Sequence, residues 1–126
     1  MRNTFVHLNA HTDMSISEGI AKTKPLVKEL SGQGGVALGV TDINNTFGAI
    51  KFYKECRSKG IKPIIGSDII LAGGSKLTLI CKNGTGYKNL CQLLSVAYDN
   101  REQNGGVLTS REDLEKYSEG LFCLIL

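Results

Sequence analysis

Short apolar runs alternate with amphipathic stretches along this chain, and this alternation constrains its fold more than any other feature. Residues 36–41 form a nearly continuous apolar run, as expected for a strand that is covered on both faces. Residues 46–59 and 86–98 instead place apolar side chains at helical spacing. Strands that alternate with helices predict an α/β fold with a largely parallel sheet and right-handed crossovers. The sheet is expected to be either doubly wound or part of a barrel.

The expected elements follow from these runs and from the glycines between them. We expect strands at 5–8, 36–41, 62–66, 68–71, 76–81 and 121–126. We expect helices over 46–59 and 86–98, and an earlier helix that begins at Thr23 and is stopped by Gly32, Gly34 and Gly35. Residues 72–75 are typical of a hairpin turn, and 100–106 of a polar loop. Thr109 and Glu112 match a capping box that opens a short helix.

The helix expected over 46–59 carries its apolar side chains at a regular spacing. Phe47, Ile50, Tyr53 and Cys56 recur every third residue, which places them on one face. We expect that face to pack on the sheet.

Length and composition favour one compact domain over residues 1–126. Hydrophobic residues make up 41% and charged residues 21%, which excludes a disordered or fibrous chain. The formal net charge is only +3, so charge alone gives no argument for nucleic-acid binding. The four cysteines form no C-x-x-C pair, and no apolar stretch resembles a signal peptide or a membrane span. We expect reduced cysteines and a cytoplasmic protein.

Candidate site residues lie where the expected strands end, because loops converge there in both architectures. His7 and His11 lie at or just past the end of the first strand, Asp42 ends the second, and Asp68 follows the third. Imidazole and carboxylate groups are ligands for zinc, manganese or iron. His11, Asp42 and Asp68 give only three plausible ligands, and Glu18 is a fourth if its loop folds inward.

Each candidate also has a structural interpretation that remains open. His7 alternates with apolar neighbours and fits a partly buried strand histidine equally well, and Asp42 fits an Asx turn. Asp68 fits a solvated strand residue. The chain has no dinucleotide or P-loop glycine pattern and no nucleophile elbow, so we expect no catalytic and no cofactor-binding residue.

Several segments resemble a known family in order and spacing. They read FVHLNAHTDMS from Phe5, GVTD from Gly39, GIKPIIG from Gly60, GYKNL from Gly86 and SVAY from Ser95. These segments resemble the N-terminal part of the PHP domain that opens the alpha subunit of bacterial DNA polymerase III. The resemblance implies the first half of a distorted seven-stranded (β/α) barrel, with mainly parallel strands and a small hairpin. The chain would then be truncated before the barrel is complete.

The resemblance also implies a damaged metal site. Members with an intact site carry His-x-His after the first strand, Asp-His after the second and a glutamate after the third. Here Asn9 stands at the first histidine of the pair, Ile43 at the histidine after Asp42, and Asp68 at the glutamate. His11 keeps the second histidine of the pair. We therefore expect no metal in this segment, with His11, Glu18, Asp42 and Asp68 as remnants.

The implied function belongs to a longer parent chain. That chain would be a DNA-directed DNA polymerase, a nucleotidyltransferase that uses magnesium for template-directed synthesis. This segment would be a scaffold whose partners are the rest of the alpha subunit and the proofreading exonuclease subunit, with DNA bound through the parent chain and no membrane. The alternative is a metal-dependent phosphoesterase or 3′–5′ exonuclease of the PHP type.

Overall fold

The structure is a computed structural model, and it describes residues 6–11, 23–46 and 48–125 of the chain. Its strands form one mixed sheet in the sequential order β1-β2-β3-β4-β5. They are β1 (His7–Ala10), β2 (Ala37–Ile43), β3 (Lys62–Ile70), β4 (Lys76–Cys81) and β5 (Leu121–Leu124). The first three run parallel, β4 is antiparallel to β3, and β5 is antiparallel to β4. Four of the five strands therefore share one direction.

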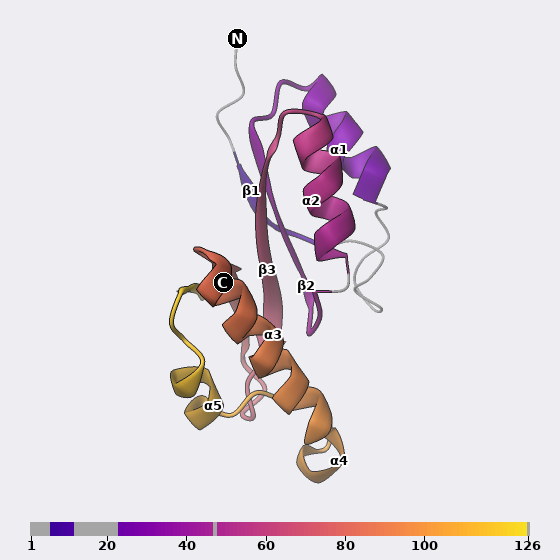
Figure 1. Cartoon of the computed structure of the whole chain (residues 1–126). Helices are drawn as coiled ribbons and strands as arrows, with labels where there is room; N and C mark the ends of the chain where they lie inside the picture. Colours follow the sequence, from indigo (N-terminus) through magenta and orange to yellow (C-terminus); the bar gives the residue numbers. More distant parts are fainter. Residues whose placement is uncertain (1–5, 12–22, 47, 126) are drawn as a thin grey trace.

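The three longest helices cover one face of this sheet. The helices are α1 (Thr23–Gly32), α2 (Ala49–Ser58), α3 (Gly84–Asp99), α4 (Arg101–Asn104) and α5 (Arg111–Lys116). Figure 1 shows α1 and α2 beside the upper part of the sheet and α3 in front of its lower part. Ile65 and Ile69 lie on the same side of β3, and the first packs in the α1–α2 core while the second packs in the α3 core. The expected α/β class with its hairpin is confirmed, and barrel closure stays a prediction.

The opposite face of the sheet carries no helix of the described chain. Leu8, Ile64 and Phe122 line a groove of about 430 Å³ that crosses this face. Leu8 is 38% and Phe122 is 54% exposed. A large apolar surface therefore remains uncovered on the side of the sheet that faces away from the helices.

Several expected strand ends were wrong. The first strand, expected to end at Leu8, ends at Ala10, and the last ends at Leu124. The strand expected at 62–66 runs on through Ile70, because its parallel pairing with β2 continues as far as Ile43 and Asp68. Asp68 therefore lies inside β3 instead of after it. Asp42 likewise lies inside β2, one residue before its end.

The expected core face of the second helix was also wrong. That helix begins at Ala49 and buries Ala49, Phe52 and Cys56, while Ile50 and Tyr53 are 66% and 47% exposed. The three buried positions form a stripe that faces β2 and β3. Phe47, the remaining member of the expected stripe, lies outside the described residues.

The segment after α3 also differs from its expected form. A single helical turn, α4, occupies part of the loop expected at 100–106, and Gly105 ends it with φ 73°. The cap of α5 is Ser110, whose hydroxyl accepts a hydrogen bond from the Asp113 backbone N–H at 3.1 Å. The capping residue is therefore one position later than the pattern at Thr109 indicated. Among the described residues, no helix is both long and apolar enough to cross a membrane.

Candidate functional site

Asp68 is the centre of a polar chain on the helix-free face of the sheet. Its side chain is fully buried. The Thr78 hydroxyl donates to Asp68 Oδ1 at 2.6 Å from the paired position on β4. His11 Nε2, just past the end of β1, lies 2.7 Å from Asp68 Oδ2. Both carboxylate oxygens are therefore engaged, and the chain joins the end of β1 to the β3–β4 hairpin.

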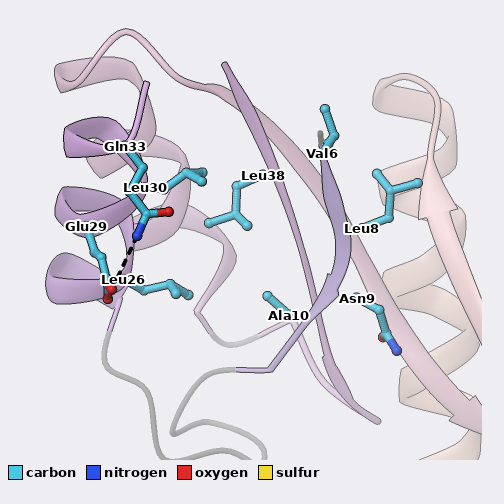
Figure 2. Close-up of a pocket in the computed structure, with 9 residues that line it drawn as sticks. All are labelled: Val6, Leu8, Asn9, Ala10, Leu26, Glu29, Leu30, Gln33 and Leu38. Carbon is cyan, nitrogen blue, oxygen red and sulfur yellow. Dashed lines mark hydrogen bonds between the residues drawn. The ribbon is translucent and has the colours of Figure 1, made fainter. Parts of the chain in front are cut away.

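A second polar pair lies on the same face. The Thr41 hydroxyl on β2 donates to Asn9 Oδ1 at 2.5 Å. Figure 2 shows the Asn9 side chain pointing away from α1, whereas the adjacent Ala10 points toward it. Asn9 therefore belongs to the helix-free face, and the oxygen through which it could bind a metal accepts a hydrogen bond instead.

Strand alternation separates the two aspartates. Ile43 pairs in register with Asp68 and lies on the same face as Thr41, two residues before it. Asp42, between them, lies on the helix-covered face. It lines a small cavity with Ala49 and Phe52 of α2, and it is only 2% exposed.

The sequence-predicted ligands are thus only partly brought together. The structure joins His11 to Asp68 but places Asp42 on the opposite face. Glu18 lies outside the described residues, as does the side chain of His7. Sequence reasoning missed Thr41 and Thr78, the hydroxyl donors of both polar pairs. In the sequence, the only indication of a role for Thr41 and Thr78 was that both lie in expected strands.

The described residues do not fit a multinuclear metal site. No three His, Cys, Asp or Glu side chains among them gather closely enough to hold a metal ion. The Nε2 atom of His11 is engaged with the Asp68 carboxylate. The apolar Ile43 side chain occupies the position beside Asp68 from which a ligand could act. A metal at this face would therefore meet an Asp68 carboxylate whose two oxygens already contact His11 and Thr78.

A further cavity lies on the other side of β1 and also lacks the chemistry of a catalytic site. It measures about 400 Å³ and lies between β1 and α1. Leu26, Leu30 and Leu38 point into it in Figure 2, and its polar rim is the Glu29–Gln33 pair of α1, joined at 3.5 Å. A single carboxylate beside an amide supplies neither a nucleophile with its base nor a metal ligand set.

The family model of the PHP domain matches residues 7–126. The chain belongs to the PHP domain family. That Asn9 and Ile43 replace metal ligands of the family stays a prediction from the resemblance.

Curated relatives of this PHP domain are alpha subunits of DNA polymerase III. That of Pseudomonas fluorescens is 41% identical over 98% of this chain, and that of Escherichia coli K12 is 42% identical over 95%. The subunit of Borreliella burgdorferi is 40% identical over 97%. The chain spans 11 to 12% of the length of these relatives.

Solved structures support the fold at low sequence identity. A Bifidobacterium adolescentis protein assigned to the metal-dependent phosphoesterases superposes with a TM-score of 0.61 and 13% identity, covering 82% of this chain and 36% of its own. An amidohydrolase from Chromobacterium violaceum gives 0.63 and 16%, covering 76% of this chain and 34% of its own. These likenesses show that the PHP domain shares its strand and helix arrangement with both proteins.

Proposed function

We propose that this PHP domain is a scaffold within the alpha subunit of a bacterial replicative DNA polymerase III, a cytoplasmic enzyme. Template-directed DNA synthesis, with magnesium as cofactor, would be carried out by the parent chain. The similarity of about 40% over nearly the whole chain to three such subunits supports the parent. The proposal also assigns the rest of that subunit, DNA and the proofreading exonuclease subunit as partners.

The scaffold role rests on one observation above all, the engagement of both Asp68 oxygens by His11 and Thr78. In a hydrolytic PHP site such groups would hold a metal that activates water. Here they hold each other, so the end of β1 is fixed to the β3–β4 hairpin by hydrogen bonds. The site thereby contributes stability to the domain instead of chemistry.

The metal content of the purified full-length subunit tests this role. We expect much less than one equivalent of zinc, manganese or iron, and we expect His11→Ala to leave that content unchanged. Magnesium at the polymerase centre does not interfere, because only these three metals are counted. A stoichiometric metal that disappears in His11→Ala would overturn the scaffold role.

The competing function is a metal-dependent phosphoesterase or 3′–5′ exonuclease. The fold shared with a metal-dependent phosphoesterase is the observation that favours it. Hydrolysis of an end-labelled single-stranded oligonucleotide, measured with each of the three metals, separates the alternatives. We expect no cleavage that depends on His11 or Asp68. Cleavage by the unaltered subunit that the single change Asp68→Ala abolishes would support the phosphoesterase or exonuclease function.

A further inference from the structure

An apolar groove lies beside α2, at the edge of the α1–α2 core. Its floor is Ile65 of β3, one wall is α2 with Ala49, Ile50, Tyr53 and Lys54, and the other wall is Tyr87 of α3. The groove measures about 330 Å³. Figure 1 shows why it exists, since the α1–α2 pair and α3 cover different parts of the sheet. Ile50 is 66% exposed at its edge.

The segment that supplies the lining of this groove is rich in positive charge. Residues 49–98 contain eight Lys or Arg and only two Asp or Glu. Residues 99–126 instead contain three Lys or Arg and six Asp or Glu. One of the two acids in the basic segment, Asp68, is buried on the opposite face of the sheet. The small net charge of the chain therefore conceals a basic segment that contains all lining residues of the groove. Two of its lysines, Lys62 and Lys82, line the groove on the opposite face of the sheet instead.

One cation of α2, Lys54, lines the groove itself, and Arg57 contacts its lining residue Tyr53. Lys51, Lys54 and Arg57 are exposed and recur every third residue along the helix. The Arg57 guanidinium lies over the Tyr53 ring, 5.9 Å from its centroid. A ligand in the groove would thus meet apolar side chains at the centre and cations at the rim, the arrangement of many protein interfaces.

We propose that this groove, which we call the α2 groove, binds an acidic amphipathic segment of a partner protein. One or two aliphatic or aromatic side chains of that segment fill the space above Ile65, and flanking carboxylates face Lys51, Lys54 and Arg57. A protein segment fits better than single-stranded nucleic acid, because five of the six lining residues offer no charge to a phosphate. The α2 groove would be the surface through which the scaffold contacts a partner protein.

The test uses the full-length subunit and a short fluorescein-labelled peptide. The peptide carries two leucines at helical i, i+4 spacing and glutamates on either side. We expect saturable binding in fluorescence anisotropy that weakens when salt rises from about 50 to about 300 mM. Absence of saturation up to about 1 mM subunit would overturn the proposal.

Variants locate the binding to the groove. Ile50→Glu changes an exposed position and should weaken binding at least tenfold without lowering the melting temperature. The double variant Lys54→Glu, Arg57→Glu should weaken it by a similar factor and gain affinity for a peptide in which lysines replace the glutamates. Arg111→Glu, an exposed charge reversal on α5, is the matched control and should change neither affinity. Equal loss in Arg111→Glu would overturn the proposal.

A nucleic-acid arm completes the test. Unlabelled oligo-dT should not displace the peptide, and displacement that Ile50→Glu abolishes would overturn the proposal in favour of a nucleic-acid site. These readouts do not depend on metal or hydrolysis. If the subunit proved to be a phosphoesterase, the α2 groove could still bind its peptide, and failure of the groove would leave the scaffold role standing.

Discussion

Asp68 reaches two neighbours with its two oxygens, His11 beyond β1 and Thr78 on β4. Sequence reasoning found the acid and the histidine because both lie near strand ends and match positions of the family pattern. It missed Thr78, because a strand threonine carries no signal of its own. The partner follows only from the hairpin register, in which Ile70 pairs with Lys76. The turn expected over 72–75 is one residue shorter than the observed connection over 71–75, and it would have paired Asp68 with a different residue of β4.

The hydroxyl of Thr78 is predicted to be important for stability. Thr78→Val keeps the shape but leaves buried Asp68 without one donor, so we expect a loss of about 1.5–3 kcal/mol in the free energy of unfolding. Thr78→Ser keeps the hydroxyl and should lose less. Urea unfolding of a protein with the complete domain measures both. No loss in Thr78→Val together with a loss in Thr78→Ser would show that the methyl group matters and the hydrogen bond does not.

The cysteines are predicted to differ strongly in reactivity. Burial, with a smaller effect from Glu55, raises the pKa of Cys56 to about 11, and burial, with a smaller effect from Cys91, raises that of Cys81 to about 11. A raised pKa lowers the thiolate fraction at neutral pH, and the thiolate is the nucleophile.

Alkylation by iodoacetamide near neutral pH checks this order. We expect exposed Cys123 to react well before Cys56 and Cys81, as followed by mass spectrometry of the native chain. The rates at Cys56 and Cys81 should rise as the pH approaches 11. In guanidinium the difference should vanish, and a Cys56 as reactive as Cys123 under native conditions would contradict it.

At the level of elements, α2 shows what periodicity could and could not predict. Its existence was predicted from spacing, but its apolar residues form two adjacent stripes. One stripe, with Ala49, Phe52 and Cys56, is buried, and Ile50 and Tyr53 lie in the exposed one. Both stripes have helical periodicity, so the pattern could not decide between them. The choice depends on where β2 and β3 lie, which is tertiary information.

The packing of α3 against the turn before β5 gives a prediction with an internal control. A Cβ at Gly86 would clash with the Gly120 carbonyl oxygen, whereas a Cβ at Gly84, in the same helical turn, meets no atom within 4 Å. We expect Gly86→Ala to destabilise the domain by about 1–3 kcal/mol. Gly84→Ala should be neutral or stabilise it by up to about 1 kcal/mol. Thermal unfolding compares the two, and equal midpoints would exclude the close approach of these backbones.

On the scale of the whole molecule, the sheet presents helices on one face and an open apolar groove on the other. The class and the order of elements were predictable because each strand follows its spatial neighbour in sequence. The face to which Asp42 points could not be predicted, because a shift of one residue along a strand moves a side chain to the opposite face of the sheet. Of the described remnant candidates, His11 and Asp68 therefore lie on one face of the sheet and Asp42 on the other.

The uncovered face predicts a poorly stable fragment. Residues 1–126 alone expose Leu8 and Phe122 beside the open strand edges of β1 and β5, which favours aggregation. We expect circular dichroism to show no cooperative melting of the monomeric fragment above about 50 °C. A chain extended through the rest of the domain is the control and should melt cooperatively. A sharp monomeric transition of the fragment above that temperature would contradict the prediction.

The position of β4 between β3 and β5 also determines the order in which the sheet can form during synthesis. Thr78 pairs with Asp68, ten residues earlier, but also with Leu124, which the ribosome adds much later. At about 5–20 residues per second, roughly 40 residues take between about 2 and 8 seconds to add. During that interval the outer edge of β4 lacks its native partner. The nascent chain is therefore most open to wrong strand pairing, or to a chaperone, before β5 leaves the ribosome.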